Sequence, residues 1–144
     1  MAFEAGLLRS DSLTAEPDGF RVSLGLPWMR SLPFSSVDGV RVSVNGAAAS
    51  PAATPVRIDG EDVQLEELAA WWDRFWFLQD RVSVAVHRIP APSVGESLDV
   101  TVEMDLRIPY ILTGPGRPLV LTQLLSRRLV AGAAGTRSVP REVA

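Results

Sequence analysis

The sequence predicts an all-β protein: an antiparallel β-sandwich with one short helix. Apolar and polar residues alternate over 98–106, and shorter alternating runs occupy 20–24, 40–44 and 82–86. A period of two gives a strand one buried face and one wet face. Only the segment 63–72 has apolar residues spaced at three and four, which predicts a short helix or helical turn. Several short alternating strands with one helical excursion are typical of a sandwich.

The strongest strand signal is the run 98–106. Its apolar positions all lie on one face: Leu98, Val100, Val102, Met104 and Leu106. A loop that contains Pro90, Pro92 and Gly95 joins this run to the preceding one at 82–86. Consecutive strands often pair, so we expect these two to be antiparallel neighbours.

Turn residues divide the first half of the chain. Asn45-Gly46 ends the strand at 40–44, and Asp59-Gly60 ends a short run at 56–58. Asn, Asp and Gly tolerate positive φ, which tight hairpin turns require. The intervening segment 47–55 is rich in Ala, Ser and Pro, and we expect it to be a surface loop.

The second half is less regular. We expect the helical segment to end near Asp73 and a strand to begin near Phe75. The alternation fades after Tyr110, and 119–130 fits either a strand or a short helix. These observations predict one β-sandwich domain over 1–130, followed by a tail over 131–144 that is mobile or draped on a partner.

Composition excludes several classes of protein. The chain has 144 residues, a net charge of −3 and no Cys. It also has no Lys, so all fourteen of its Lys and Arg residues are Arg. Hydrophobic residues make up 47%, enough apolar surface to exclude a disordered chain. No apolar run is long enough for a membrane helix, and Met1–Ser10 lacks the pattern of a signal peptide. We therefore expect a cytoplasmic protein that binds neither nucleic acid nor membrane.

The residues that could carry chemistry are few and scattered. His87 is the only His, so zinc or iron would rest on carboxylates almost alone. Asp73 with Asp80, or Asp99 with Glu103, could be an acid–base pair, but exposed carboxylates on a strand are ordinary solubilising residues. No nucleophile elbow, phosphate loop or dinucleotide motif is present. We expect no catalytic residue, cofactor site or metal site in this chain.

Aromatic and proline-rich segments are more informative. The segments 26–34 and 107–111 are apolar, and their prolines are incompatible with a central strand. Such residues either pack in the core and at its rim or contact another chain, and exposed Trp could also stack on sugars. The residues predicted for a partner interface are Trp28, Arg30, Leu32, Pro33, Trp71, Trp72, Trp76, Arg107, Pro109 and Tyr110.

Three segments carry a resemblance to a known family. They read FRVSLGLPWMRSLPFSSVDGVRVSVNG, WWDRFWFLQDRVSVAV and LDVTVEMDLRIPYI, and together they span Phe20 to Ile111. In this order they resemble the small (β) subunit of bacterial C-glycoside deglycosidases. The segments 47–54 and 114–144 show no such match.

The resemblance implies a partner and a reaction. The partner would be a large TIM-barrel subunit related to sugar isomerases, assembled with the small sandwich as a hetero-oligomer of αβ pairs. That large subunit would hold a divalent metal, typically manganese, and the acid–base His. The substrate would be a 3-keto C-glycoside, such as an oxidised flavonoid C-glucoside, cleaved by β-elimination. No family catalytic residue can be assigned to a position of this chain.

Three hypotheses follow. In the first, the chain is a small subunit, inactive alone, of this carbon–carbon lyase. In the second, it is a stand-alone carbohydrate-binding sandwich, which requires an exposed, coplanar pair of Trp rings. In the third, it is a self-contained hydrolase that uses two carboxylates.

Overall fold

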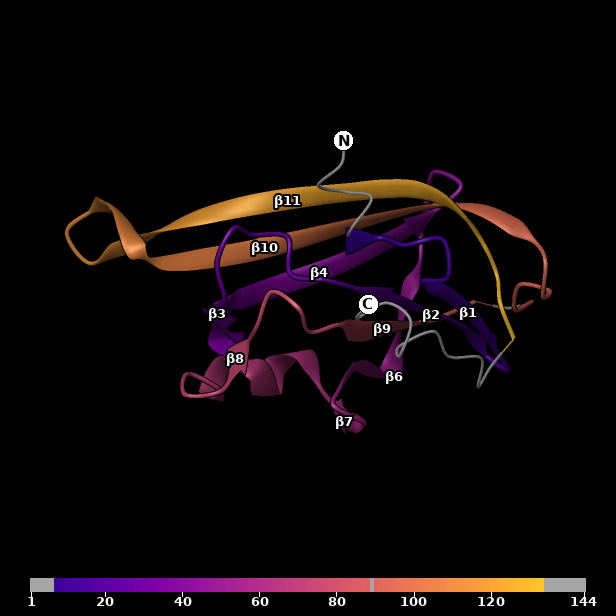
Figure 1. Ribbon diagram of the computed structural model, residues 1–144, viewed down its shortest axis with the longest axis horizontal. Helices are drawn as coiled ribbons and strands as arrows, with labels where there is room; N and C mark the ends of the chain where they lie inside the picture. The colour runs from indigo at the N-terminus through magenta and orange to yellow at the C-terminus, as the bar shows by residue number, and fades with distance from the viewer. Residues whose placement is uncertain (1–6, 89, 134–144) are drawn as a thin grey trace.

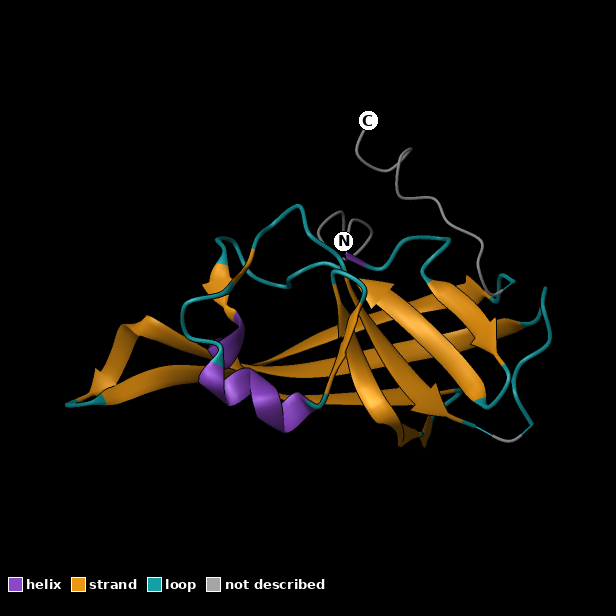
Figure 2. Ribbon diagram, turned by 90° about the horizontal axis from the view of Figure 1, so that it is seen from below, coloured by secondary structure: helices purple, strands orange, loops and turns teal. Residues whose placement is uncertain are grey.

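The computed structural model describes residues 7–88 and 90–133, which form two antiparallel sheets packed face to face (Figures 1 and 2). The predicted fold class is confirmed. The first sheet has the order β1 (Leu13–Glu16), β2 (Gly19–Leu24), β9 (Val82–His87), β6 (Ser50–Ile58) and β7 (Glu61–Val63). The second has the order β11 (Arg117–Val130), β10 (Ser97–Gly114), β4 (Val37–Val44) and β5 (Ala47–Ala48).

Cross-strand rows of apolar side chains line the space between the sheets. In the first sheet one row crosses all five strands, through Leu13, Val22, Val84, Val56 and Val63. In the second sheet a matching row joins Val42, Val102 and Leu125. All of these residues are buried. The alternation read at 20–24, 40–44, 82–86 and 98–106 therefore assigns the inward face of those strands correctly.

Strand β10 contributes the longest inward row. Its core residues are Leu98, Val100, Val102, Met104, Leu106 and Ile108, none more than 2% exposed. Burying a side chain of this size stabilises a protein by about 1.5–3 kcal/mol. Because β10 pairs with β4 on one side and β11 on the other, this row anchors the whole second sheet.

The two predicted turns are confirmed. Asn45-Gly46 joins β4 to β5, and Asp59-Gly60 joins β6 to β7, with positive φ at all four residues. Asn45 also holds the neighbouring strand, since its side-chain Oδ1 accepts the Asp99 N–H at 2.9 Å. Two-residue turns with positive φ match the twist of antiparallel hairpins.

The predicted pairing of the runs 82–86 and 98–106 is wrong. β9 pairs with β2 and β6 in the first sheet, whereas β10 pairs with β4 and β11 in the second. The chain between them crosses from one sheet to the other. Alternation reports which face of a strand is buried, and it carries no information about the neighbouring strand.

The predicted surface loop at 47–55 is also wrong. Ala47–Ala48 form β5, and β6 begins at Ser50 and pairs with β9 through Ser50 and Pro51. The register then shifts before Val56. This irregularity accommodates the prolines, which cannot donate to a regular ladder. The open alternative at 119–130 is decided for a strand, since Arg117–Val130 is β11.

The segment predicted to be helical contains one short helix. A 3-10 helix, η2, spans Leu65–Ala70, while Val63 ends β7. Gln64 donates its backbone N–H to the Glu67 carboxylate at 3.0 Å, which caps the first turn. A second 3-10 helix, η1 (Phe34–Ser36), follows β3 (Leu32–Pro33), and β3 pairs with β8 (Phe75–Trp76) as a separate ribbon. The strand expected near Phe75 is thus present.

Both ends of the described chain are held by the first sheet. Arg81 donates to the Leu7 carbonyl at 3.1 Å and to the Ser12 hydroxyl at 2.9 Å. Beyond β11, Gly132 forms a parallel bridge with Thr14 of β1. Most of the tail predicted at 131–144 lies outside the described residues. None of the helices in the described part of the chain has the length and apolar character to cross a membrane.

The outer face of the second sheet carries a cross-strand polar network. Arg41 of β4 donates two hydrogen bonds to the Asp105 carboxylate, at 2.9 and 3.0 Å. The Thr122 hydroxyl of β11 donates to the same group at 2.7 Å. Hydrogen bonds from Arg41 and Thr122 lower the pKa of Asp105 from 3.8 to about 2. One carboxylate therefore joins three strands.

The substitution Asp105→Asn tests this network. We expect it to lower the free energy of unfolding by about 1 kcal/mol at pH 7, because the charged carboxylate that accepts the hydrogen bonds is replaced by a neutral amide. The folded-state pKa is depressed, so the stabilisation is present above about pH 4 and disappears as pH falls from 3.8 toward 2. Urea unfolding at pH 7 and at pH 3 measures both effects. A difference between wild type and variant that does not shrink at the lower pH would contradict the assignment.

Candidate functional site

The ribbon β3–β8 closes one end of the sandwich. Leu32 pairs with Trp76, and Pro33 pairs with Phe75. Leu32 and Trp76 are each 1% exposed, and the Trp76 ring stacks on Phe34 with centroids 5.9 Å apart. Both predicted interface residues are therefore core residues, which support the surface from beneath. Pro33 is half-buried.

Large apolar side chains lie exposed on the outside of this ribbon and beside it. Met29 and Trp72 are 72% and 71% exposed, and Phe77 is 47% exposed. The Leu78 N–H donates to the Ser31 hydroxyl at 3.2 Å, which places the loop after β8 against the loop before β3. We call this surface the apolar end, and its exposed members are Met29, Trp72, Phe75, Phe77, Leu78 and Tyr110.

A small aromatic and cationic cluster joins the apolar end to β10. The Trp28 indole Nε1 donates to the Tyr110 hydroxyl at 2.6 Å. The Arg30 guanidinium lies over the Tyr110 ring, 5.2 Å from its centroid. Trp28 is half-buried, whereas Arg30, Pro109 and Tyr110 are exposed. Four of the predicted interface residues are thus brought together by the fold.

Arg107 fastens the same end from beneath. Its Nη2 donates to the Ser35 carbonyl at 2.7 Å and lies 3.3 Å from an Asp38 carboxylate oxygen. These contacts link β10 to η1 and to the start of β4. Arg107 is partly exposed, so it can still contribute to a surface.

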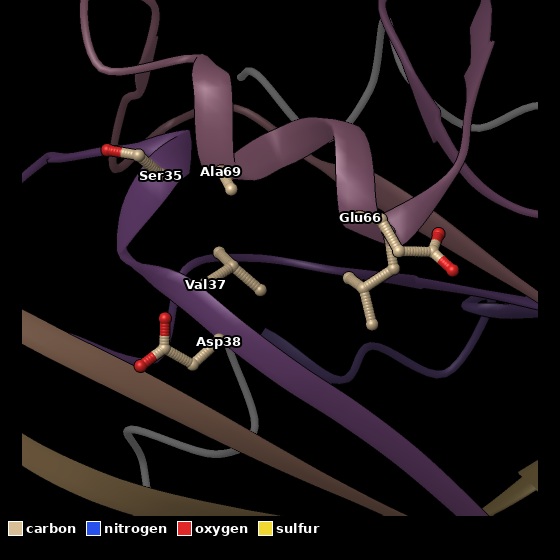
Figure 3. A pocket seen from close by; sticks show the side chains of 6 residues that line it. Ser35, Val37, Asp38, Glu66 and Ala69 are labelled. Atoms are coloured by element: carbon tan, nitrogen blue, oxygen red, sulfur yellow. The ribbon is translucent and has the colours of Figure 1, made fainter.

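A shallow hollow of about 230 Å³ lies next to this contact, between η2 and the start of β4 (Figure 3). Val37 and Ala69 stand on opposite walls, and the carboxylates of Asp38 and Glu66 lie on opposite sides of it. Ser35 and Leu65 complete the lining. The hollow has room for one side chain of a partner, and its carboxylates do not converge on a point where catalysis could occur.

The Trp71 ring already contacts two side chains of its own chain. The Arg74 guanidinium lies over the Trp71 ring, 4.1 Å from its centroid, and Phe34 contacts that ring edge-on at 5.7 Å. Trp76 is in the core. Among the described residues, Trp72 is therefore the only strongly exposed Trp. The coplanar pair that the carbohydrate-binding hypothesis requires is not formed.

One of the two carboxylate pairs proposed for a hydrolase, Asp99 with Glu103, is occupied by basic side chains, and in the other pair the Asp80 carboxylate accepts the Phe77 N–H at 3.4 Å. Asp99 binds Arg128 at 3.0 Å, and Glu103 lies 3.6 Å from Arg41. Within residues 7–88 and 90–133, no three His, Asp or Glu side chains are grouped closely enough to hold a metal ion. His87 is exposed at the end of β9. The prediction of a divalent metal on a partner subunit stays a prediction.

Sequence reasoning missed several residues of the apolar end. Met29, Phe75, Phe77 and Leu78 lie in segments that were singled out, but they were not assigned to the interface. A signal was available, because the run from Phe75 to Leu78 is apolar at every position. A continuous apolar run is typical of a segment that is buried on both sides, and here the described part of the chain covers only one side.

Comparison with known proteins identifies the family. A profile of the C-glycoside deglycosidase beta subunit family matches residues 3–110. The chain belongs to this family. The match contains the Trp28–Tyr110 contact and all of β3 and β8, and it ends at Tyr110. The resemblance of the sequence to this family is therefore confirmed.

Curated relatives in this family have nearly the same length. A C-glycoside deglycosidase beta subunit of Arthrobacter globiformis is 32% identical over 130 residues, which cover 90% of this chain and 98% of the relative. A 3'-dehydrocarminate deglycosidase beta subunit of a Microbacterium species is 28% identical over 127 residues, covering 88% and 94%. A C-glycoside deglycosidase beta subunit of Microbacterium trichothecenolyticum is 29% identical over 131 residues, covering 91% and 95%.

Two Trp substitutions separate the core of this end from its surface. We expect Trp76→Ala to lower the free energy of unfolding by about 3–5 kcal/mol, because a buried ring leaves a cavity. Trp72→Ala should change it by less than about 0.5 kcal/mol, since the ring is exposed. Denaturant unfolding of both variants measures the contrast. Equal effects would mean that the two rings are not divided between core and surface as described.

Proposed function

We propose that the chain is the accessory small subunit of a hetero-oligomeric C-glycoside deglycosidase and that it docks through its apolar end onto a large TIM-barrel subunit. The observation that carries the proposal is the exposed apolar surface around β3–β8, in a chain that belongs to a family of beta subunits. The partner interface would include Trp28, Arg30, Pro33, Trp71, Trp72, Arg107, Pro109 and Tyr110, supported from beneath by Leu32 and Trp76.

The composition of the apolar end favours a protein partner. Interface centres are enriched in aromatic residues, Met and Arg, and depleted in Lys and acidic residues. The Phe75 and Phe77 rings stack with their centroids 6.2 Å apart and stay exposed, and Met29 is 72% exposed. Several large exposed apolar side chains at one end of a domain are typical of an interaction site. Cover by a large subunit would remove it from water.

The reaction we propose follows from the chemistry of a 3-keto sugar. The ketone acidifies the C2 proton, so a base of the large subunit can remove it. The electron pair of the C2–H bond then forms a C1–C2 double bond, and the aglycone leaves with the electron pair of the C1–C bond and gains a proton. A divalent metal, expected to be manganese, would be bound by the large subunit and supply Lewis-acid stabilisation. This chain would hold the active site of the large subunit in the geometry that catalysis requires. The complex would work in the cytoplasm.

Co-expression tests the proposed function. The chain would be produced alone and together with a sugar-isomerase-like barrel protein encoded in the same genome. Light scattering after size exclusion should detect a hetero-complex, and cleavage of a 3-keto C-glucoside with Mn²⁺ should require both chains. A monomer that ignores the barrel protein, or full activity of either chain alone, would reject the proposal.

A single exposed ring tests the docking surface. We expect Phe77→Ser to weaken the complex at least about tenfold, because centrally placed aromatics dominate interface energies. Val94→Ser is the matched control: Val94 is also exposed, but it lies in the loop before β10, at the opposite end of the β10–β11 hairpin. Titration of the large subunit with each variant measures the dissociation constants. If Phe77→Ser binds as wild type does, the apolar end is not the docking surface.

A further inference from the structure

The hairpin β10–β11 extends beyond the sandwich as a two-stranded arm. Ile108 is the last fully buried residue of β10, and the residues from Pro109 to Thr113 are all exposed. Figures 1 and 2 show the tip of the hairpin projecting past the ribbon β3–β8, with no other element beside it. We call residues 109–120 the arm. A strand rises about 3.3 Å per residue, so the arm reaches roughly 20 Å from the sandwich.

The arm is apolar on both strands. Leu112 of β10 is 61% exposed and Val120 of β11 is 55% exposed, and Tyr110 and Ile111 are exposed as well. Within the described part of the chain, only the base of the arm touches the sandwich: Leu119, opposite Ile108, packs partly against the core, and Tyr110 contacts Trp28 and Arg30. A solvent-exposed ribbon with this composition is unusual, because apolar side chains normally face a core.

The backbone pairing of the arm is weak. After the pair Ile108–Leu119 the register slips, and the next partners are Leu112–Pro118 and Gly114–Arg117. The residues between Ile108 and Leu112 thus oppose no residue of β11, and Pro109 and Pro118 cannot donate backbone hydrogen bonds. Two-stranded ribbons are marginally stable in water even with regular pairing. Contact with another molecule would therefore stabilise the arm.

The charge of the arm indicates what kind of partner surface would bind it. From Leu106 to Ala133 the chain has no Asp or Glu. Arg107 and Arg128 bind carboxylates of this chain, and Arg127 donates to the Leu8 carbonyl. Arg117, at the tip, has no ion pair with any described residue. A complementary surface would be apolar with an acidic side chain opposite the tip.

We propose that the arm clasps the large subunit, seated in an apolar groove of that subunit whose far edge carries an acidic residue facing Arg117. This inference rests on the proposed function and adds a second contact to it. The position of Tyr110 indicates which partner the arm contacts. It begins the arm, and it is also fixed to Trp28 and Arg30 beside the apolar end. A subunit that covers the apolar end therefore continues onto the arm without a break.

The double substitution Leu112→Asp with Val120→Asp tests the clasp. Both side chains are exposed, so the variant should keep the melting temperature and the circular dichroism of wild type. We expect its dissociation constant for the large subunit to rise at least tenfold, mainly through faster dissociation. Val94→Asp is the control, and Arg117→Glu should show a smaller loss that grows as salt is lowered.

A chemical probe gives the same answer without disturbing apolar contacts. The chain has no Cys, so Thr113→Cys places a single thiol in the arm and Val94→Cys places one at the other end. Maleimide labelling of each chain is followed by intact mass, with and without large subunit. The large subunit should slow labelling of the Thr113→Cys thiol at least tenfold and leave the Val94→Cys thiol unaffected. Equal labelling of both thiols in the complex would overturn the proposal.

The outcomes separate the clasp from the proposed function. If wild type binds the large subunit but the arm variant binds equally well, the clasp is rejected and the proposed function stands. If wild type does not bind the large subunit at all, both are rejected. If wild type alone is a dimer by light scattering and the arm variant is a monomer, the arm seats on a second copy of this chain, which also rejects the clasp.

Discussion

The inward row of β10 is the contact on which the rest of the structure depends. Its side chains from Leu98 to Ile108 are almost completely removed from water and face the first sheet. The same strand aligns β4 on one side and β11 on the other. Past the end of the row, the strand carries Tyr110 out of the sandwich at a fixed position. The buried core therefore fixes the position of Tyr110, which belongs to the surface that we propose binds the partner.

At the end of the sandwich near β3 and β8, some residues close the core and their neighbours form the exposed surface. Trp76 and Leu32 point inward and close the core, whereas Phe75 and Phe77 remain outside. Because the two sets alternate on one short ribbon, the exposed rings are positioned by a buried neighbour. Preorganisation of this kind lowers the entropy lost when a partner binds. Stability of the core and geometry of the surface are therefore linked at this end.

The sequence predicted the buried face of a strand where burial is one-sided, and it predicted strands poorly where burial is not one-sided. The strands at 20–24 and 40–44 show clean alternation because each has one face on the core, whereas Ala85 is buried on the other face of β9. Strand β6 was missed at its start, since Pro51 and small residues carry no such pattern. The alternation also faded after Tyr110, where the arm has no core-facing side to impose it. Of the candidate site, the aromatic segments were found, but Leu32 and Trp76 belong to the core.

The sequence by itself determined the faces of the strands, the turns at Asn45-Gly46 and Asp59-Gly60, and the family. These are local properties: hydrophobic periodicity and backbone preference act over a few residues, and a family match needs only their order. The tertiary structure alone decided that β9 and β10 belong to different sheets. It also decided which aromatic rings are covered. Both depend on contacts between segments far apart in the chain, and no local pattern encodes which distant segment will supply the cover.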